Sequence, residues 1–202
     1  DPIFEFTVFY EGVPQGADNP PWAGGFTWSK DKDGRDWIAV SCEGEGARIW
    51  WPNKDHITAE GDSVRMSYTV PSNMVAVGNG TLRNITTQDD KSTYEWFVSN
   101  PINNYNISVQ IGSYVAVQDT FIKDDTVQYM NHYVLDYNSD IASDYFKQSK
   151  EVIRFYEKFF GDYQWYEDGY KLVEVPYLGM EHQSAVTYGN GFSLYNGVRS
   201  KS

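Results

Sequence analysis

Regular alternation of apolar and polar residues predicts short β-strands along the first part of the chain. The clearest run, 63–70, has the period of two expected of a strand with one buried face, with apolar positions at Val64, Met66, Tyr68 and Val70. Runs rich in β-branched and aromatic residues predict further strands at 3–10, 37–42, 93–98 and 106–111. Asp33-Gly34 and Asn79-Gly80 are hairpin-type turn signals. We therefore expect an antiparallel β-sandwich or saddle domain over about residues 1–120.

The hydrophobic pattern changes after about residue 121. Residues 127–135 predict another strand, and 138–161 has the spacing of an amphipathic helix, with apolar positions near one face at Ile141, Tyr145, Val152, Tyr156 and Phe159. Gly161 can end this helix, so we expect a single helix of about 20 residues. A strand at 170–177 follows it. The fold class is thus predicted as mainly β, with an α+β segment over 121–202.

Composition indicates a folded protein and excludes one large class of partners. Hydrophobic residues make up 41% of the 202 residues and aromatic residues 17%, which is too much apolar surface for a disordered chain. The formal net charge is −12, whereas a nucleic-acid-binding protein needs clustered Lys and Arg. We expect no nucleic-acid partner. The negative charge favours cationic ligands, such as the amino terminus of a peptide, although a solvated acidic surface would also explain it.

Cysteine usage and hydropathy bear on disulfides, structural zinc and membrane spans. Cys42 is the only cysteine, so the chain has neither an internal disulfide nor a thiolate cluster for structural zinc. No apolar run approaches the roughly 20 residues needed to span a bilayer, and the first ten residues lack the features of a signal peptide. Compartment and oligomeric state have no readable signature in the residues.

The histidines show no zinc-hydrolase signature. The motif HExxH would place two imidazoles one helical turn apart around a glutamate base, and it is absent around His56, His132 and His182. The inverted form HxxEH also fails, because Leu178 lies three positions before Glu181. No metal site is therefore predicted within the chain.

The stretch "LGMEH" at 178–182, directly after a predicted strand, carries the strongest functional signal. It resembles the GxMEN motif of the M1 family of zinc aminopeptidases, the gluzincins. Gly179, Met180 and Glu181 match the motif, His182 replaces its asparagine and Leu178 replaces its first glycine.

Two further stretches match the same family in the same order. Residues 41–55 are similar to a family segment of the form Q-C-E/Q, an arginine, a proline and an aspartate, matched by Cys42, Glu43, Arg48, Pro52 and Asp55. Residues 100–112 resemble the Pro-Met-x-x-Tyr strand that closes the N-terminal domain. The resemblance implies a fragment that contains the end of an N-terminal β-domain (1–120) and the start of a thermolysin-like catalytic domain (121–202), ending before HExxH. It also suggests an exported or periplasmic bacterial enzyme.

The resemblance assigns roles to individual residues. It implies that Glu43 and Glu181 hold the free α-amino group of a peptide substrate, which suits an ammonium group because carboxylates make strong charge-assisted hydrogen bonds. It places the backbone of Gly179 and Met180 near the scissile peptide, with His182 as a neighbour of the site. Zn²⁺ would belong to the full-length aminopeptidase, with ligands outside this chain, so we expect the fragment alone to bind no catalytic zinc and to show no peptidase activity.

Several alternatives remain open at this stage. Glu45 is a second candidate for the role of Glu43, and Arg48 and Asp55 are expected to form a structural ion pair. Trp50 and Trp51 could form a sugar platform, but they point to opposite faces of an extended segment, so at least one belongs to the core. His56 and His132 are expected to be surface or core residues. The alternative functions are a non-catalytic β-sandwich module that binds carbohydrate or peptide, and a degenerate member of the family.

Overall fold

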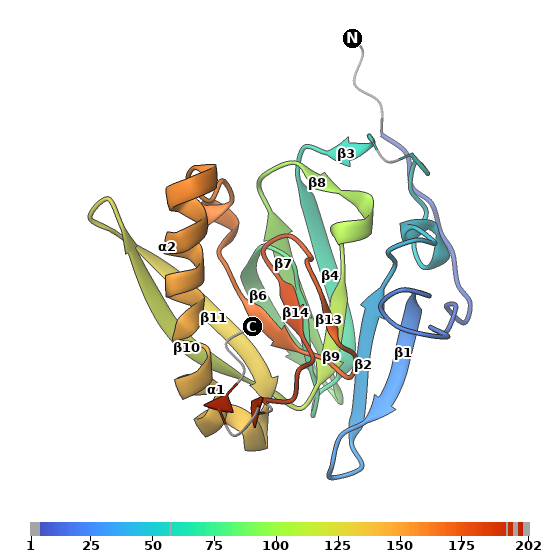
Figure 1. The fold of residues 1–202 in the computed structure, drawn as a ribbon. Coiled ribbons are helices and arrows are strands. Elements are labelled where there is room, and N and C mark those ends of the chain that lie inside the picture. Colours follow the sequence, from blue (N-terminus) through green and yellow to red (C-terminus); the bar gives the residue numbers. More distant parts are fainter. Residues whose placement is uncertain (1–4, 57, 193, 196–197, 200–202) are drawn as a thin grey trace.

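Two antiparallel sheets pack face to face and form the larger part of the protein (Figure 1). The structure, a computed structural model, describes residues 5–56, 58–192, 194–195 and 198–199. The first sheet has the order β1-β2-β9-β5, formed by β1 (Gly25–Lys30), β2 (Asp36–Ser41), β9 (Val109–Gly112) and β5 (Val75–Gly78). The second has the order β4-β7-β6, formed by β4 (Val64–Pro71), β7 (Lys91–Val98) and β6 (Thr81–Gln88).

The alternation predicted for β4 is confirmed, and it explains the sandwich core. Met66 and Val70 are buried, whereas the polar residues between them face solvent. They join one hydrophobic cluster with Trp96 on β7 and with Val40 and Val77 on the opposing sheet. Burial of these side chains contributes roughly 1.5–3 kcal/mol each. The sandwich therefore gives the candidate site a rigid support.

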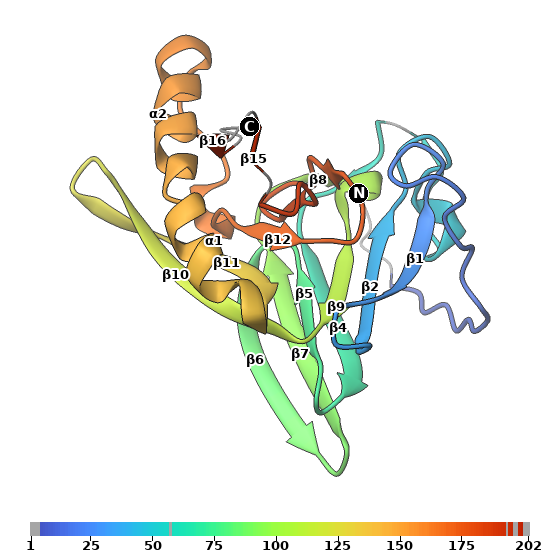
Figure 2. The same ribbon diagram turned by 60° about the horizontal axis from the view of Figure 1, so that its bottom comes forward.

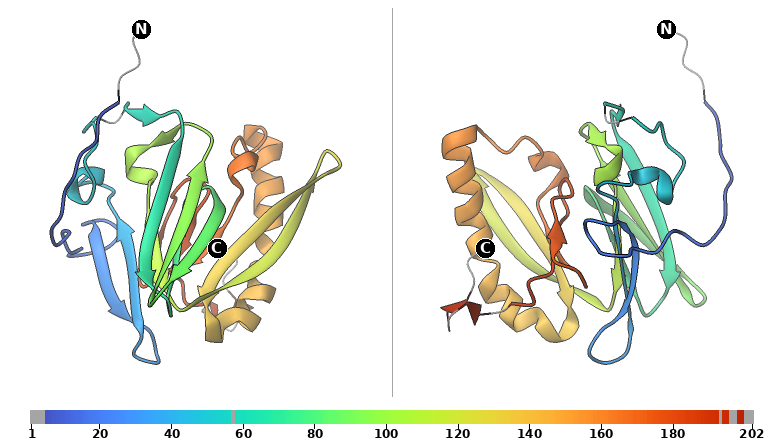
Figure 3. Two further views of the ribbon diagram at one scale, coloured as in Figure 1. Left: turned by 180° about the vertical axis from the view of Figure 1, so that it is seen from behind. Right: turned by 45° about the vertical axis from the view of Figure 1, so that its right-hand side comes forward.

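A third sheet and two helices make up the second part of the protein. This sheet has the order β10-β11-β12-β14-β13, formed by β10 (Tyr114–Lys123), β11 (Thr126–Leu135), β12 (Leu172–Glu174), β14 (Val186–Tyr188) and β13 (Gly179–Met180). β12 runs parallel to both of its neighbours, and the other pairs are antiparallel. The helices α1 (Ser139–Tyr145) and α2 (Gln148–Phe160) cover the face of this sheet that points away from the sandwich (Figure 3).

Short elements complete the chain. The strand pairs are β3 (Glu60–Gly61) with β8 (Ile102–Asn103), and β15 (Leu194–Tyr195) with β16 (Val198–Arg199). Single 3₁₀ turns occur at η1 (Ala47–Ile49), η2 (Asn104–Asn106), η3 (Asp136–Asn138) and η4 (Tyr166–Asp168).

None of the helices in the described part of the chain is long and apolar enough to cross a membrane.

The prediction of one long helix is wrong, because the helix breaks between α1 and α2. The backbone N–H and hydroxyl of Ser149 both donate to the carbonyl of Phe146, at 2.9 and 2.7 Å. Phe146 itself is buried against the third sheet, which holds the chain at the break. α2 then runs beside the β10–β11 hairpin (Figure 2) with Ile153 buried. Three of the residues predicted for its apolar face are exposed instead: Val152, Tyr156 and Phe159.

Two further predictions about local structure are wrong. Residues 5–10 form no strand and are exposed, so the predicted strand at 3–10 is absent from its described part; residues 3 and 4 lie outside the described residues. Asn79-Gly80 connects β5 to β6, which lie in different sheets, so this turn is not a hairpin. Asp33-Gly34 does join the paired strands β1 and β2, as predicted.

The sandwich and the third sheet are also joined by a continuous apolar contact. Ala39 on β2 packs with Val175, Tyr177 and Met180, which follow β12 or lie on β13. The partly buried Tyr105 of η2 packs against the same cluster. This contact brings the segment "LGMEH" next to the end of β2, where the second motif begins.

Candidate functional site

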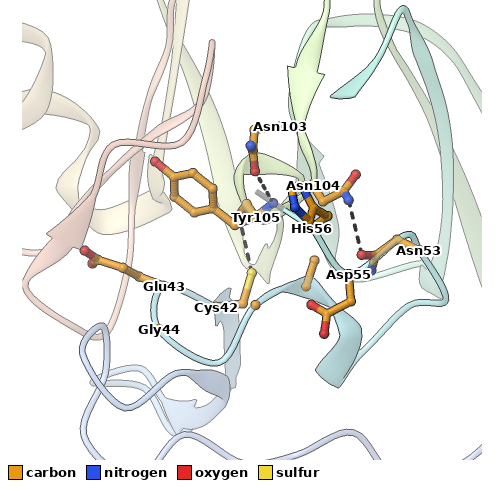
Figure 4. A pocket seen from close by; sticks show the side chains of 11 residues that line it. Cys42, Glu43, Gly44, Asn53, Asp55, His56, Asn103, Asn104 and Tyr105 are labelled. Carbon is orange, nitrogen blue, oxygen red and sulfur yellow. Dashed lines mark hydrogen bonds between the residues drawn. The ribbon is translucent and has the colours of Figure 1, made fainter. Parts of the chain in front are cut away.

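A cavity of about 290 Å³ lies where the turn after β2 meets η2 (Figure 4). Its walls come from segments that are far apart in the sequence: Cys42, Glu43, Gly44, Gly46, Ala47, Asn53, Asp55, His56, Asn103, Asn104 and Tyr105. The polar ends of Glu43 and Tyr105 point to the same side of this cavity (Figure 4). The structure thus brings the second and third sequence motifs together.

The turn after β2 separates the two candidate glutamates. Glu43 is exposed and lines the cavity. Glu45 turns toward the sandwich, where its carboxylate accepts a hydrogen bond of 2.8 Å from the backbone N–H of Gly24. A carboxylate that holds a backbone amide has a structural role, so Glu43 is the better placed of the two to meet a ligand.

Tyr105 connects the cavity to the motif "LGMEH". Its hydroxyl donates a hydrogen bond to Oε1 of Glu181 at 3.1 Å, and its backbone N–H donates to the side chain of Asn103, which caps η2. Burial raises the pKa of the Tyr105 hydroxyl above its ordinary value, and the negative charges of Glu181 and Glu43 raise it further. The hydroxyl therefore stays protonated and can donate, with both carboxylates in electrostatic reach.

Strand geometry explains the Gly-Met pair of the motif. Gly179 has φ +126°, and a Cβ at this position would lie 2.6 Å from the carbonyl oxygen of Thr187 on β14. Met180 is buried in the cluster that joins the two parts of the protein. β13 is the last strand of the third sheet, so one of its backbone edges has no neighbouring strand among the described residues. Such an edge can pair with an extended peptide.

His182 is fully buried, although the adjacent Glu181 is exposed. Burial lowers the pKa of the imidazole to about 3, so it is neutral at pH 7. Among the described residues neither ring nitrogen has a hydrogen-bond partner. Neither Glu181 nor His182 is among the residues that line the cavity, and Glu181 is linked to it through Tyr105.

The structure also agrees with the expectations for the Arg48–Asp55 ion pair and for the two tryptophans. Arg48 and Asp55 form the predicted ion pair, at 3.0 Å. Trp50 and Trp51 are partly buried against the main core, with their rings edge to face at 6.4 Å. Both indoles thus contribute to packing, in agreement with the expectation that at least one belongs to the core.

The other two histidines are also accounted for. His56 is exposed, and its Nδ1 lies 2.8 Å from the hydroxyl of Thr58. His132 is buried in the second part of the protein, where its Nδ1 accepts a hydrogen bond from the backbone N–H of Leu172 at 2.9 Å. Burial lowers the pKa of His132 to about 4. They are the surface and core residues that the sequence led us to expect.

The side chains present do not fit a zinc site. In the described ranges no three His, Cys, Asp or Glu side chains come close enough together to hold a metal ion. The only thiol, Cys42, is buried, and this burial raises its pKa to about 12, which disfavours the thiolate that zinc requires. We therefore derive no metal-dependent step from these residues.

Two site features escaped the sequence reasoning. Tyr105 was visible only as the tyrosine of the Pro-Met-x-x-Tyr pattern within 100–112, and nothing in the sequence linked it to Glu181. A set of buried hydrogen bonds that fastens the residues after Glu181 to the sandwich also left no local pattern, because its partners lie up to 104 residues apart.

Comparison with solved structures identifies the fold. No family model and no curated protein matches the sequence. An M1 zinc metallopeptidase from Deinococcus radiodurans is similar in structure, with a TM-score of 0.67 and 16% sequence identity over 88% of this chain. A mutant two-domain M1 zinc metallopeptidase bound to L-tryptophan gives a TM-score of 0.71 with 17% identity over 88% of this chain. A mutant of the Deinococcus enzyme bound to the substrate Tyr-Ser-Ala gives 0.67, with 16% identity over 89%.

The chain spans about 40% of the length of these structures. The likeness extends over most of this chain and agrees with the resemblance found in its three motifs. This chain has the fold of the corresponding part of M1 zinc metallopeptidases.

Proposed function

We propose that this chain forms the amine-recognition part of a zinc aminopeptidase that removes N-terminal residues from peptides. Residues 1–120 would be the end of its N-terminal β-domain, and residues 121–202 the start of its thermolysin-like catalytic domain. Glu43 and Glu181 would hold the free α-amino group of the substrate between them. Zinc and the residues that bind it would be supplied by a part of the full-length enzyme outside this chain.

The observation that carries the proposal is that Tyr105 lies within electrostatic reach of both glutamates. Its hydroxyl donates to Glu181, and the negative charges of both Glu181 and Glu43 act on its pKa. An ammonium group has three N–H donors, which two carboxylates can accept together, and charge-assisted hydrogen bonds of this kind are about twice as strong as neutral ones. Tyr105 would hold Glu181 in place while leaving its second carboxylate oxygen for the ligand.

The backbone beside the glutamate supports the same orientation of the substrate. β13 offers a strand edge directly before Glu181, so an extended peptide could pair with Gly179 and Met180 while its amino group reaches the carboxylates. His182 would support this site from within, as a buried neighbour of Glu181. Because the site would hold the free α-amino group, the complete enzyme would cleave only the first peptide bond of its substrate and so act as an exopeptidase.

A carbohydrate-binding module has less support. The two aromatic residues that the sequence offers as a sugar platform, Trp50 and Trp51, are partly buried against the core cluster of the sandwich. The cavity is lined by two carboxylates, Glu43 and Asp55, and although Asp55 is paired with Arg48, the charge of Glu43 suits a cation better than a neutral sugar.

A pair of charge-removing variants tests the proposal. We expect Glu181→Gln to weaken binding of the dipeptide Phe-Ala by about tenfold or more, because a hydrogen bond to a charged group contributes about 1.5–3 kcal/mol. The control is Glu167→Gln, which removes the same charge from an exposed position in η4. Titration calorimetry measures both. Equal affinity of Glu181→Gln and the parent protein would contradict the proposal.

A further inference from the structure

Gln183 and Ser184, which follow Glu181 and His182 in the chain, are fastened to the sandwich by buried and partly buried hydrogen bonds. The backbone N–H of Gly80 donates to the hydroxyl of Ser184 at 2.8 Å, and that hydroxyl donates to the carbonyl of Gln183 at 2.7 Å. The backbone N–H of Gln183 donates to the side-chain oxygen of Asn106, at 3.0 Å. Since Asn106 directly follows Tyr105, the same short turn holds Glu181 on one side and Gln183 on the other.

Asn79 completes the attachment from the sandwich. Its side chain is fully buried, and its amide donates to the carbonyls of Gln183 at 2.7 Å and Asn106 at 2.9 Å. Its side-chain oxygen accepts from the backbone N–H of Ser108 at 2.8 Å. The amide group and the side-chain oxygen of Asn79 therefore both have hydrogen-bond partners.

Lys171 crosses from the third sheet to the same place. Its Nζ donates to the carbonyl of Gly80 at 2.5 Å and to the carbonyl of Ser184 at 2.9 Å. It also lies over the ring of Trp96, 5.1 Å from the ring centroid. One buried amine thus joins the sandwich turn to the segment that follows Glu181.

The amine of Lys171 is buried, and this burial affects its charge. The residue is buried next to β12, and the charge that acts on it is that of Asp168, which is itself held by Ser99 and Asn100. Burial lowers the pKa of Lys171 to about 7. A neutral amine still has two N–H donors, enough for both carbonyls, so the bridge persists on either side of neutral pH.

We propose that Lys171 is a positioning residue for the amine site: by bridging Gly80 and Ser184 it fixes the segment after Glu181, and so holds the Glu181 carboxylate against Tyr105. This inference rests on the function proposed above. A structural role alone would stabilise the whole fold evenly. A positioning role acts on residues 181–186 first and on ligand affinity through them.

The test combines amide hydrogen exchange with ligand binding. Lys171→Met keeps the length of the side chain but removes its donors. We expect exchange in 181–186 to become about tenfold faster, exchange in β1 and β2 to stay unchanged, and the Kd for Phe-Ala to rise about fivefold. The control Lys150→Met removes a partly buried lysine that pairs with Asp119 on the far side of the third sheet, and it should change neither quantity.

A second variant cuts the attachment from the other side. Asn79→Asp removes the amide donor to Gln183 while keeping the acceptor for Ser108, and it should reproduce the faster exchange of 181–186. Unchanged exchange in this segment, or equal acceleration throughout the chain, in both variants would overturn the inference. If the parent protein does not bind Phe-Ala, the proposed function fails, whereas the exchange experiment still decides whether Lys171 holds the segment.

Discussion

The hydroxyl of Tyr105 donates a hydrogen bond to Oε1 of Glu181 across 76 positions of sequence. Tyr105 belongs to η2, which leads into β9 of the sandwich, and Glu181 directly follows β13, an edge strand of the third sheet. The contact therefore joins the two parts of the protein through Tyr105, which lines the same cavity as Glu43. The proposed amine site depends on it.

Removing that hydroxyl should loosen Glu181 without unfolding the protein. The bond is exposed to solvent and acts on the ligand only through Glu181, so we expect Tyr105→Phe to weaken binding of Phe-Ala by less than the loss of a direct bond to a charged group would, roughly threefold to tenfold. The matched control is Tyr129→Phe, since Tyr129 is 69% exposed and lies outside the cavity. Calorimetric titration of the two variants makes the comparison, and identical affinities would argue against a role for the Tyr105 hydroxyl.

The two glutamates of the turn after β2 should behave differently. Glu45→Ala deprives the backbone N–H of Gly24 of its acceptor and should lower the free energy of unfolding by about 1–2 kcal/mol. Glu43→Gln should leave that free energy unchanged, because Glu43 is exposed, and should instead weaken dipeptide binding. Urea denaturation and calorimetry separate the effects. A loss of stability in Glu43→Gln equal to that in Glu45→Ala would refute the distinction.

Acid should destabilise the protein partly through His182. The pKa of this imidazole is about 3 in the folded protein and about 6.5 when unfolded, so between these values only the unfolded chain takes up the proton. The contribution of His182 to stability is thus lost as the pH falls from 6.5 toward 3, by about 1.4 kcal/mol per pH unit.

The variant His182→Leu isolates this effect. Urea denaturation between pH 7 and pH 4 should give a stability that falls less steeply in His182→Leu than in the parent protein. His132, whose pKa burial lowers to about 4, contributes its own acid sensitivity equally to both proteins. Parallel pH profiles would show that His182 does not titrate as its burial implies.

Cys42 should be chemically inert in the native protein. Its side chain is fully buried, burial raises the pKa of the thiol to about 12, and its Sγ donates to the carbonyl of Tyr105. Because the thiolate is the reactive species, we expect a disulfide reagent at pH 8 to leave the folded chain unlabelled and to label it in guanidinium. Rapid labelling without denaturant would contradict this placement of Cys42.

Two glycines with similar backbone angles should respond unequally to alanine. Gly80 has φ +74°, and a Cβ there would collide with the backbone carbonyl of Phe97, whereas Gly34 has φ +79° and open space around it. Gly34→Ala should cost about 1 kcal/mol for the left-handed conformation alone, and Gly80→Ala clearly more. Thermal denaturation of both variants measures the difference. Equal losses would contradict the close approach at Gly80.

The parts of the fold that the sequence predicted are those where one face of an element is buried. β4 is such a strand, and its alternation was readable. β6 is exposed along nearly its whole length, so no alternation marks it, and the pattern missed it. The break after α1 depends on the packing of Phe146 against the sheet, which is a tertiary effect that local periodicity does not contain.

The site follows the same division. Glu43 and Glu181 could be selected from short motifs, because each lies within a run of family-like residues. The bond from Tyr105 to Glu181 and the bridge of Lys171 between Gly80 and Ser184 join segments that are distant in sequence. Such contacts exist only once the sandwich and the third sheet have come together.

The most direct test of the central claim changes the ligand and leaves the protein untouched. Phe-Ala and its N-acetylated form differ only in the charged amino group that Glu43 and Glu181 are proposed to hold. We predict that the parent protein binds Phe-Ala measurably by calorimetry and that acetylation lowers the affinity by about tenfold or more. Equal affinity for the two peptides, or no affinity for either, would contradict the account.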